Sequence, residues 1–417
     1  MKKTTTIWII GIILLVGVFV VARVFLRVSL FADNDVSRAY TPECLGATPA
    51  EDLSIRDTCW YQPLAVAYRK GGLKQAVQLY GDLFEKSINF AGFCHWSAHY
   101  MGDLAYTSYM QNGHIALPEE NDFRGPSRVC ATLLYHSFVG RMVEKAATID
   151  IGFAQASAFC DDLNLRVKSG EGTEKQIPQC YIGIGNGLTL YYLRHGENIE
   201  KSAEKAARMC EQLPSDHLDT KRYCGQGIFD AITMSFWGTE KIENVSFQKF
   251  YEEPYWLCET PGVRQFKQQC YEYLKSAVWE VVKGDLRKAG KLLEKVEETE
   301  IAEAAMWSFA LSASPSIVTG TRTYESVVAD CVSLQERLRG ACVAGIVWNQ
   351  VRLTDWSKNK DAIMQFCNNT AFSETVRKRC IDEIFVSAKE NLDDERKKVI
   401  CNDVENNVGS HPVACDT

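Results

Sequence analysis

The chain lacks the features that mark several common classes of protein. Beyond its N-terminus no run of lysines and arginines is longer than three residues, and its formal net charge is −7. Because phosphate recognition normally needs a basic surface, we expect no nucleic-acid partner. No serine lies in the G-x-S-x-G motif that exposes the nucleophile of many hydrolases. With 46% hydrophobic and 24% charged residues, the composition is that of an ordinary globular protein.

Cysteine is abundant, but no Cys-x-x-Cys pair occurs, which argues against structural zinc. The cytosol would keep sixteen cysteines reduced, whereas an even number outside the cytoplasm predicts a disulfide framework. Most of the cysteines lie close in sequence to one other cysteine and enclose a short loop with it, and each such pair is called a couple below. Cys94 and Cys130 remain and can pair with each other. Each bridge could add about 3 kcal/mol of stability. The predicted bridges are Cys44–Cys59, Cys94–Cys130, Cys160–Cys180, Cys210–Cys224, Cys258–Cys270, Cys331–Cys342, Cys367–Cys380 and Cys401–Cys415.

A membrane anchor is predicted at the N-terminus. Lys2 and Lys3 precede the apolar stretch Ile7–Leu26, whose length matches the ~20 residues that span a bilayer. A cleaved signal peptide is the alternative, but a cut after Ala32 would put bulky Leu30 where a small residue is preferred. Basic residues balance on the two sides of the stretch, so the cysteines decide the orientation. They place the bulk of the chain outside the cytoplasm, at a cell surface or in a periplasm.

The chain thus divides into an anchor with short flanks, residues 1–32, and an extracytoplasmic domain, residues 33–417. The alternative is that this domain consists of two lobes, residues 33–313 and 324–417. Runs that follow the second cysteine of a couple are amphipathic. In the run after Cys270, apolar residues recur at three- and four-residue steps, which indicates a helix rather than a strand. These apolar residues are Leu274, Val278, Val281 and Val282.

Glycines follow several of these runs, and Gly71, Gly196 and Gly284 are expected to end helices in the left-handed conformation. The repeating unit is then helix, glycine turn, helix and disulfide-closed loop, at spacings of roughly 35–50 residues. We therefore predict an all-α fold, an α-solenoid of helical hairpins with disulfide-closed loops, preceded by one transmembrane helix.

Two stretches, AYRKGGLKQAVQLY and VWEVVKGDLRKAGKLL, resemble the turn of tetratricopeptide and Sel1-like repeats. In those repeats a small residue packs between helices about five residues after a glycine turn; here Ala76 follows Gly71 and Ala289 follows Gly284. The resemblance covers short pieces of a few units, and neither the cysteine couples nor the irregular spacing belongs to it. It implies a solenoid that scaffolds or binds ligands, and it transfers no catalytic residue.

Histidines next to the second cysteine couple are the first candidate site. His95, His99 and Asp103 follow one another at four-residue steps, so one helix face would present two imidazoles and a carboxylate that can bind a metal. A zincin would need a glutamate beside the first histidine, where Trp96 stands instead. A Cys94–Cys130 bridge would bring His136 toward the same spot. The alternative is that these histidines are hydrogen-bonded core or groove residues.

A polar row is the second candidate site. His136, Asn186 and Asp230 each lie six residues after the second cysteine of a couple, in three consecutive units. Equivalent positions of a solenoid stack in a row, so these residues are predicted to bind a ligand on the concave face. The alternative is a coincidence of polar residues on the solvent side of each helix. The nearby glycines of GIGNG lack the preceding strand of a nucleotide-binding loop, and close helix packing explains them more simply.

Together these features predict a membrane-anchored, extracytoplasmic helical-repeat scaffold. It would bind a protein, a peptide or an envelope polymer on its concave face, without a cofactor and without catalysis. The alternative is a metal-dependent enzyme, a hydrolase or an oxidoreductase, in which a divalent metal is bound by His95, His99 and His136. Asp103 would then be a fourth ligand or would orient one imidazole.

Overall fold

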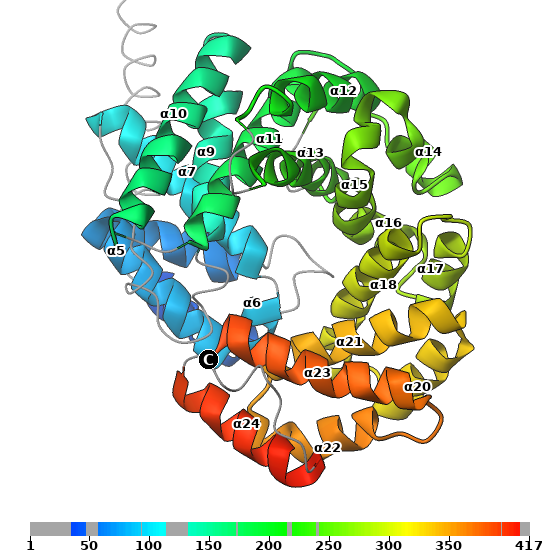
Figure 1. Ribbon diagram of the computed structural model, residues 1–417. Coiled ribbons are helices and arrows are strands. Elements are labelled where there is room, and N and C mark those ends of the chain that lie inside the picture. The colour runs from blue at the N-terminus through cyan, green and yellow to red at the C-terminus, as the bar shows by residue number, and fades with distance from the viewer. Residues whose placement is uncertain are drawn as a thin grey trace, which may run out of the picture. The chain divides into compact units, whose positions relative to one another are not determined.

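The computed structural model describes residues 35–46, 57–92, 94–113, 132–171, 174–214, 219–238, 242–392 and 394–408. Every regular element in these ranges is helical, which confirms the all-α prediction (Figure 1). Within them, no helix combines the length and the hydrophobicity needed to cross a bilayer. The predicted anchor lies outside the described residues. Two compact units result, one up to Phe90 and one from Ala91 onward.

The first unit is built around the helix α5 (Gln62–Lys86). Non-helical backbone at Gly71 and Gly72 kinks this helix, and it is Gly72, with φ +69°, that takes the left-handed conformation expected of Gly71. Trp60 packs edge-on against Phe90, with 5.1 Å between ring centroids. The unit also contains α2 (Asp35–Arg38), α3 (Pro42–Leu45) and the π-helical turn η1 (Asp57–Tyr61).

A first set of helices in the second unit packs one against the next along the chain. These helices are α7 (Cys94–Asn112), α9 (Leu133–Glu144), α11 (Gln176–Arg194), α13 (Thr220–Phe236), α15 (Lys267–Tyr273), α18 (Thr299–Ala313), α21 (Glu336–Leu353) and α23 (Glu374–Asn391). Because α18 packs against α21, the optional lobe boundary between residues 313 and 324 falls inside this unit.

A second set of helices packs against the first set. It comprises α10 (Ile149–Lys168), α12 (Ile199–Cys210), α17 (Leu286–Leu293), α20 (Tyr324–Ser333), α22 (Trp356–Cys367) and α24 (Asp394–Val408). The remaining short helices are α6 (Ile88–Gly92), α14 (Gln248–Glu252), η3 (Trp256–Glu259), η4 (Pro261–Phe266), α16 (Lys275–Val281) and α19 (Pro315–Val318).

Two of the glycine turns predicted from the sequence are confirmed. Gly196 follows α11 with φ +85°, and Gly284 follows α16 with φ +70°. A polar N-cap then starts the next helix: Asn198 accepts a hydrogen bond from the Lys201 amide, and Asp285 caps α17 in the same way. Helix, glycine turn and capped helix are therefore local features that the residue pattern determines.

Six predicted bridges are confirmed: Cys44–Cys59, Cys160–Cys180, Cys210–Cys224, Cys258–Cys270, Cys331–Cys342 and Cys367–Cys380. Cys94 and Cys401 are disulfide-bonded as well, and their predicted partners, Cys130 and Cys415, lie outside the described residues. Cys210 and Cys367 end α12 and α22 as expected, whereas Cys160 lies inside α10. This framework indicates an oxidising, extracytoplasmic environment.

Glycines on α11 and α13 bring three helices of the first set into backbone contact. A Cβ at Gly183 would lie 2.5 Å from the His136 carbonyl oxygen on α9, and one at Gly187 would collide with the Gly140 carbonyl. On the other side of α11, a Cβ at Gly227 of α13 would collide with the Ile182 carbonyl in the same way. The glycines of GIGNG thus serve close helix packing, as the sequence indicated. They hold α9 and α13 tightly against α11.

Candidate metal site

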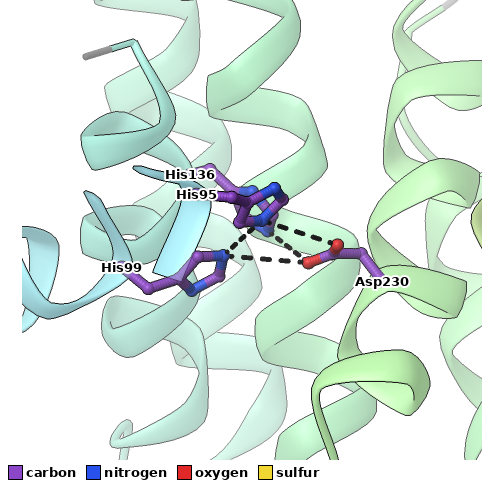
Figure 2. Close-up of side chains that lie close together, drawn as sticks. All are labelled: His95, His99, His136 and Asp230. Atoms are coloured by element: carbon purple, nitrogen blue, oxygen red, sulfur yellow. Dashed lines mark hydrogen bonds and ion pairs between the residues drawn. The ribbon is translucent and has the colours of Figure 1, made fainter. Parts of the chain in front are cut away.

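Four side chains that can bind a metal meet within the second unit (Figure 2). His95 and His99 come from successive turns of α7, so their rings stack with 4.8 Å between centroids. Their Nε2 atoms are 2.9 Å apart. His136 comes from α9 and Asp230 from α13. Helices α7, α9, α11 and α13 pack in that order, so the two imidazoles of α7 face a third imidazole and a carboxylate.

The distances among these four groups suit one small ion. Asp230 Oδ2 is 3.3 Å from His136 Nε2 and 3.9 Å from His99 Nε2, and Oδ1 is 3.7 Å from His95 Nε2. One ligand atom from each residue lies within 4.8 Å of all the others. Ligands at ~2.0–2.1 Å from a tetrahedral zinc ion are separated by roughly 3.3 Å. The observed separations bracket that value, so the group could hold a metal ion.

The histidines are in the protonation state that a metal requires. Burial lowers the pKa of His136 well below its usual 6.5, and the opposing Asp230 charge does not overcome this shift. Burial, together with the charges of His95 and Arg141, also lowers the pKa of His99 well below 6.5. Burial lowers the pKa of His95 as well. Neutral imidazoles keep a lone pair for coordination, so the site is prepared for a cation without first losing protons.

His136 is the least satisfied member of the group. Its side chain is 2% exposed, and within the described part of the chain neither ring nitrogen has a hydrogen-bond partner. A neutral imidazole always offers one donor and one acceptor. Leaving both unpaired inside a protein is costly, and buried polar groups of this kind commonly bind an ion or a water molecule. Nε2 faces the Asp230 carboxylate, and a cation between them would satisfy both groups.

Asn186 supports the site from α11. Its Nδ2 donates a hydrogen bond of 3.1 Å to Asp230 Oδ2, which limits rotation of the carboxylate. The structure therefore brings together the whole polar row predicted from the sequence, His136, Asn186 and Asp230. It also joins that row to His95 and His99, which the sequence placed near the N-terminal end of the row and, together with His136, in the candidate metal site. His136 belongs to both candidate sites, and this overlap is the signal in the sequence that links them.

Asp103, the expected fourth ligand, is not part of this group. Arg141 on α9 binds its carboxylate with two hydrogen bonds, Nε to Oδ1 at 2.6 Å and Nη2 to Oδ2 at 3.0 Å. The Ser137 hydroxyl donates a further bond of 3.2 Å to Oδ1. These contacts tie α7 to α9, so Asp103 helps to position the histidines, and Asp230 is the carboxylate beside them.

Access to the group is one-sided. The His95 side chain is 39% exposed, whereas those of His99, His136 and Asp230 are 7%, 2% and 8% exposed. A ligand from solvent would therefore approach past His95.

Comparison of the chain with protein-family models, with curated proteins and with solved structures finds no match. The functional argument therefore depends on the geometry of this site.

Proposed function

We propose that this protein binds one divalent transition metal of the zinc class through His95, His99, His136 and Asp230. The observation that carries the proposal is the buried His136 ring, which lacks a hydrogen-bond partner among the described residues while its Nε2 lies 3.3 Å from a carboxylate oxygen. Three imidazoles and one carboxylate suit zinc, copper, iron or nickel, whereas calcium and magnesium prefer sites built from oxygen alone.

Charge and hydrogen bonding support the same ion class. With neutral histidines, one carboxylate leaves a divalent ion with a net charge of about +1, which is far easier to bury than the free ion. Asn186 supplies the outer contact that commonly orients a ligating carboxylate. A bound metal of this kind would act as a Lewis acid, so the enzymatic alternative, a hydrolase or an oxidoreductase, remains open to this site.

The surrounding architecture that we propose is a membrane-anchored, extracytoplasmic α-solenoid related in design to tetratricopeptide and Sel1-like repeats. The successive packing of α7 to α23 and the regular bridges support it. The polar row is too deeply buried to contact a polymer, since His136, Asn186 and Asp230 are 1%, 3% and 6% exposed. In this proposal the row binds an ion, and a protein, peptide or envelope-polymer partner would bind to another part of the domain.

Cobalt titration of the metal-free, full-length protein with intact disulfides tests the proposal. Co²⁺ reports tetrahedral coordination through its visible absorption, and Zn²⁺ should displace it. We expect one ion per wild-type chain and at least about a hundredfold weaker binding for His136→Gln or Asp230→Asn. His195→Gln is the matched control, because His195 is exposed and stacks on Tyr191 away from the group. Failure of the oxidised wild type to bind either ion tightly would overturn the proposal.

A further inference from the structure

A lysine lies near the metal-binding group on the next helix along the chain. Thr233 is on α13, one turn after Asp230, and its hydroxyl donates a hydrogen bond of 2.9 Å to the Tyr273 carbonyl oxygen. Lys275 follows two residues later and begins α16, which packs against α13. This hydrogen bond therefore places the start of α16 beside the turn of α13 that carries Asp230.

The charge of Lys275 acts on the proposed ligands. Lys275 is near enough for its charge to interact with His95 and with the Asp230 carboxylate. Burial also lowers the pKa of Lys275 to about 8, with opposing contributions from the nearby Glu272 and Asp230 carboxylates and a further lowering by Arg352. Lys275 therefore keeps most of its charge at neutral pH although it is largely withdrawn from water.

This ammonium has no direct partner in the described part of the chain. Neither a hydrogen bond nor an ion pair within 4.0 Å involves Lys275, which is only partly exposed. Other lysines in comparable positions are paired, for example Lys267 with Glu298 at 3.0 Å. A partly desolvated cation without a direct ion-pair partner costs free energy that an anionic ligand would recover.

Metal binding would increase this surplus of positive charge. A divalent ion and Lys275 together carry about three positive charges, against the two negative charges of Asp230 and Glu272. His95 is the one partly exposed ligand, and the charge of Lys275 reaches it. An incoming anion would therefore reach the metal past His95.

We propose that the metal centre takes a small oxyanion, a phosphate or a carboxylate, as an exchangeable ligand held jointly by the metal and by Lys275. This inference rests on the metal binding proposed above. It assigns the site to the capture or activation of an oxyanion rather than to structural support alone. The anion would enter as a fifth ligand or would replace His95, the one partly exposed ligand of the four.

The full-length protein loaded with Co²⁺ allows a direct test. Inorganic phosphate and acetate are titrated separately at constant ionic strength, and binding is followed by the change in the visible absorption of Co²⁺. We expect wild type to bind at least one of the two anions saturably. Lys275→Gln should bind that anion at least about tenfold more weakly than wild type. Lys275→Arg, which keeps the charge, should bind the anion within about threefold of wild type. Lys288→Gln is the matched control, because Lys288 is 64% exposed on α17.

The Co²⁺ affinity of each variant is measured first, and we expect it to stay within about threefold of wild type. Tight Co²⁺ binding with no spectral response to either anion would overturn the inference and leave the metal proposal standing. Equal phosphate and acetate affinities in Lys275→Gln and wild type would also overturn it. So would anion binding of the same strength to the metal-free protein. A wild-type protein that does not bind Co²⁺ would instead contradict the metal proposal itself.

Discussion

His136 Nε2 on α9 lies 3.3 Å from Asp230 Oδ2 on α13, although both helices pack against α11. The approach is possible because glycines remove the side chains at the contacts with α11. A Cβ at Gly183 would come within 2.5 Å of the His136 carbonyl oxygen. The glycines of α11 therefore determine the spacing of the proposed metal ligands, and four predictions follow from this arrangement.

Gly183→Ala should separate α9 from α11 and weaken the site. Over-packing of this kind costs about 1–3 kcal/mol, and because the displaced residue is His136 itself we expect at least tenfold weaker Co²⁺ binding. Gly196→Ala is the control: its φ of +85° makes alanine strained, but no atom is within 4 Å of the added methyl group. It should lower thermal stability without changing metal affinity. Unchanged Co²⁺ affinity in Gly183→Ala would argue against this packing.

The metal-free protein should lose stability as the pH falls below 6.5. Burial lowers the pKa values of His99 and His136 well below that usual value, so between the folded and unfolded pKa values the unfolded chain binds more protons. Each histidine then contributes a slope of up to about 1.4 kcal/mol per pH unit, with stability rising as pH rises. Urea unfolding above and below pH 6.5 measures this slope. His136→Gln should reduce it and His195→Gln should not; a wild-type stability independent of pH in this window would contradict the burial argument.

Asp103→Asn should separate the structural role of Asp103 from a ligand role. Asp103 accepts two hydrogen bonds from Arg141, and loss of its charge should cost about 1–2 kcal/mol of stability. Co²⁺ affinity should fall by less than about tenfold, because α7 loosens while all four proposed ligands remain. Asp230→Asn is the comparison and should weaken Co²⁺ far more. Equal loss in the two variants would make Asp103 a ligand.

Peptide mapping under non-reducing conditions should identify the partners of Cys94 and Cys401, the two bridged cysteines whose predicted partners lie outside the described residues. Cys94 and Cys401 are disulfide-bonded, and the sequence pattern assigns them to Cys130 and Cys415. Peptides that link Cys94 to Cys130 would confirm that the start of α7 is tied to the segment before α9. Links between other cysteines would contradict the predicted pairing of neighbouring cysteines, and free thiols would contradict the oxidising compartment.

Local patterns were sufficient to predict the helices, the glycine turns and the bridges. Gly284 followed by Asp285 is a helix end and a helix start within a few residues, and Cys210 and Cys224 are close enough in sequence to pair without long-range information. The turn at Gly71 was misplaced by one residue, because either glycine of the pair can adopt the left-handed conformation and the residue pattern does not distinguish them.

The composition of the site needed the tertiary structure. A step of four residues turns a helix by roughly 40°, so Asp103 is rotated roughly 80° from His95 and reaches Arg141 instead of the histidines. Asp230 enters the group only because α11 holds α9 and α13 close together, and no local pattern reports that distance. The sequence thus indicated every member of the observed group but divided them between two sites.

Elemental analysis of the purified, full-length protein tests the central claim most directly. Wild type and His195→Gln should carry close to one zinc-class ion per chain, and His136→Gln should carry much less while keeping its disulfides and helical content. A wild type without stoichiometric metal after supply of zinc, or a His136→Gln variant that keeps its full complement, would contradict the account.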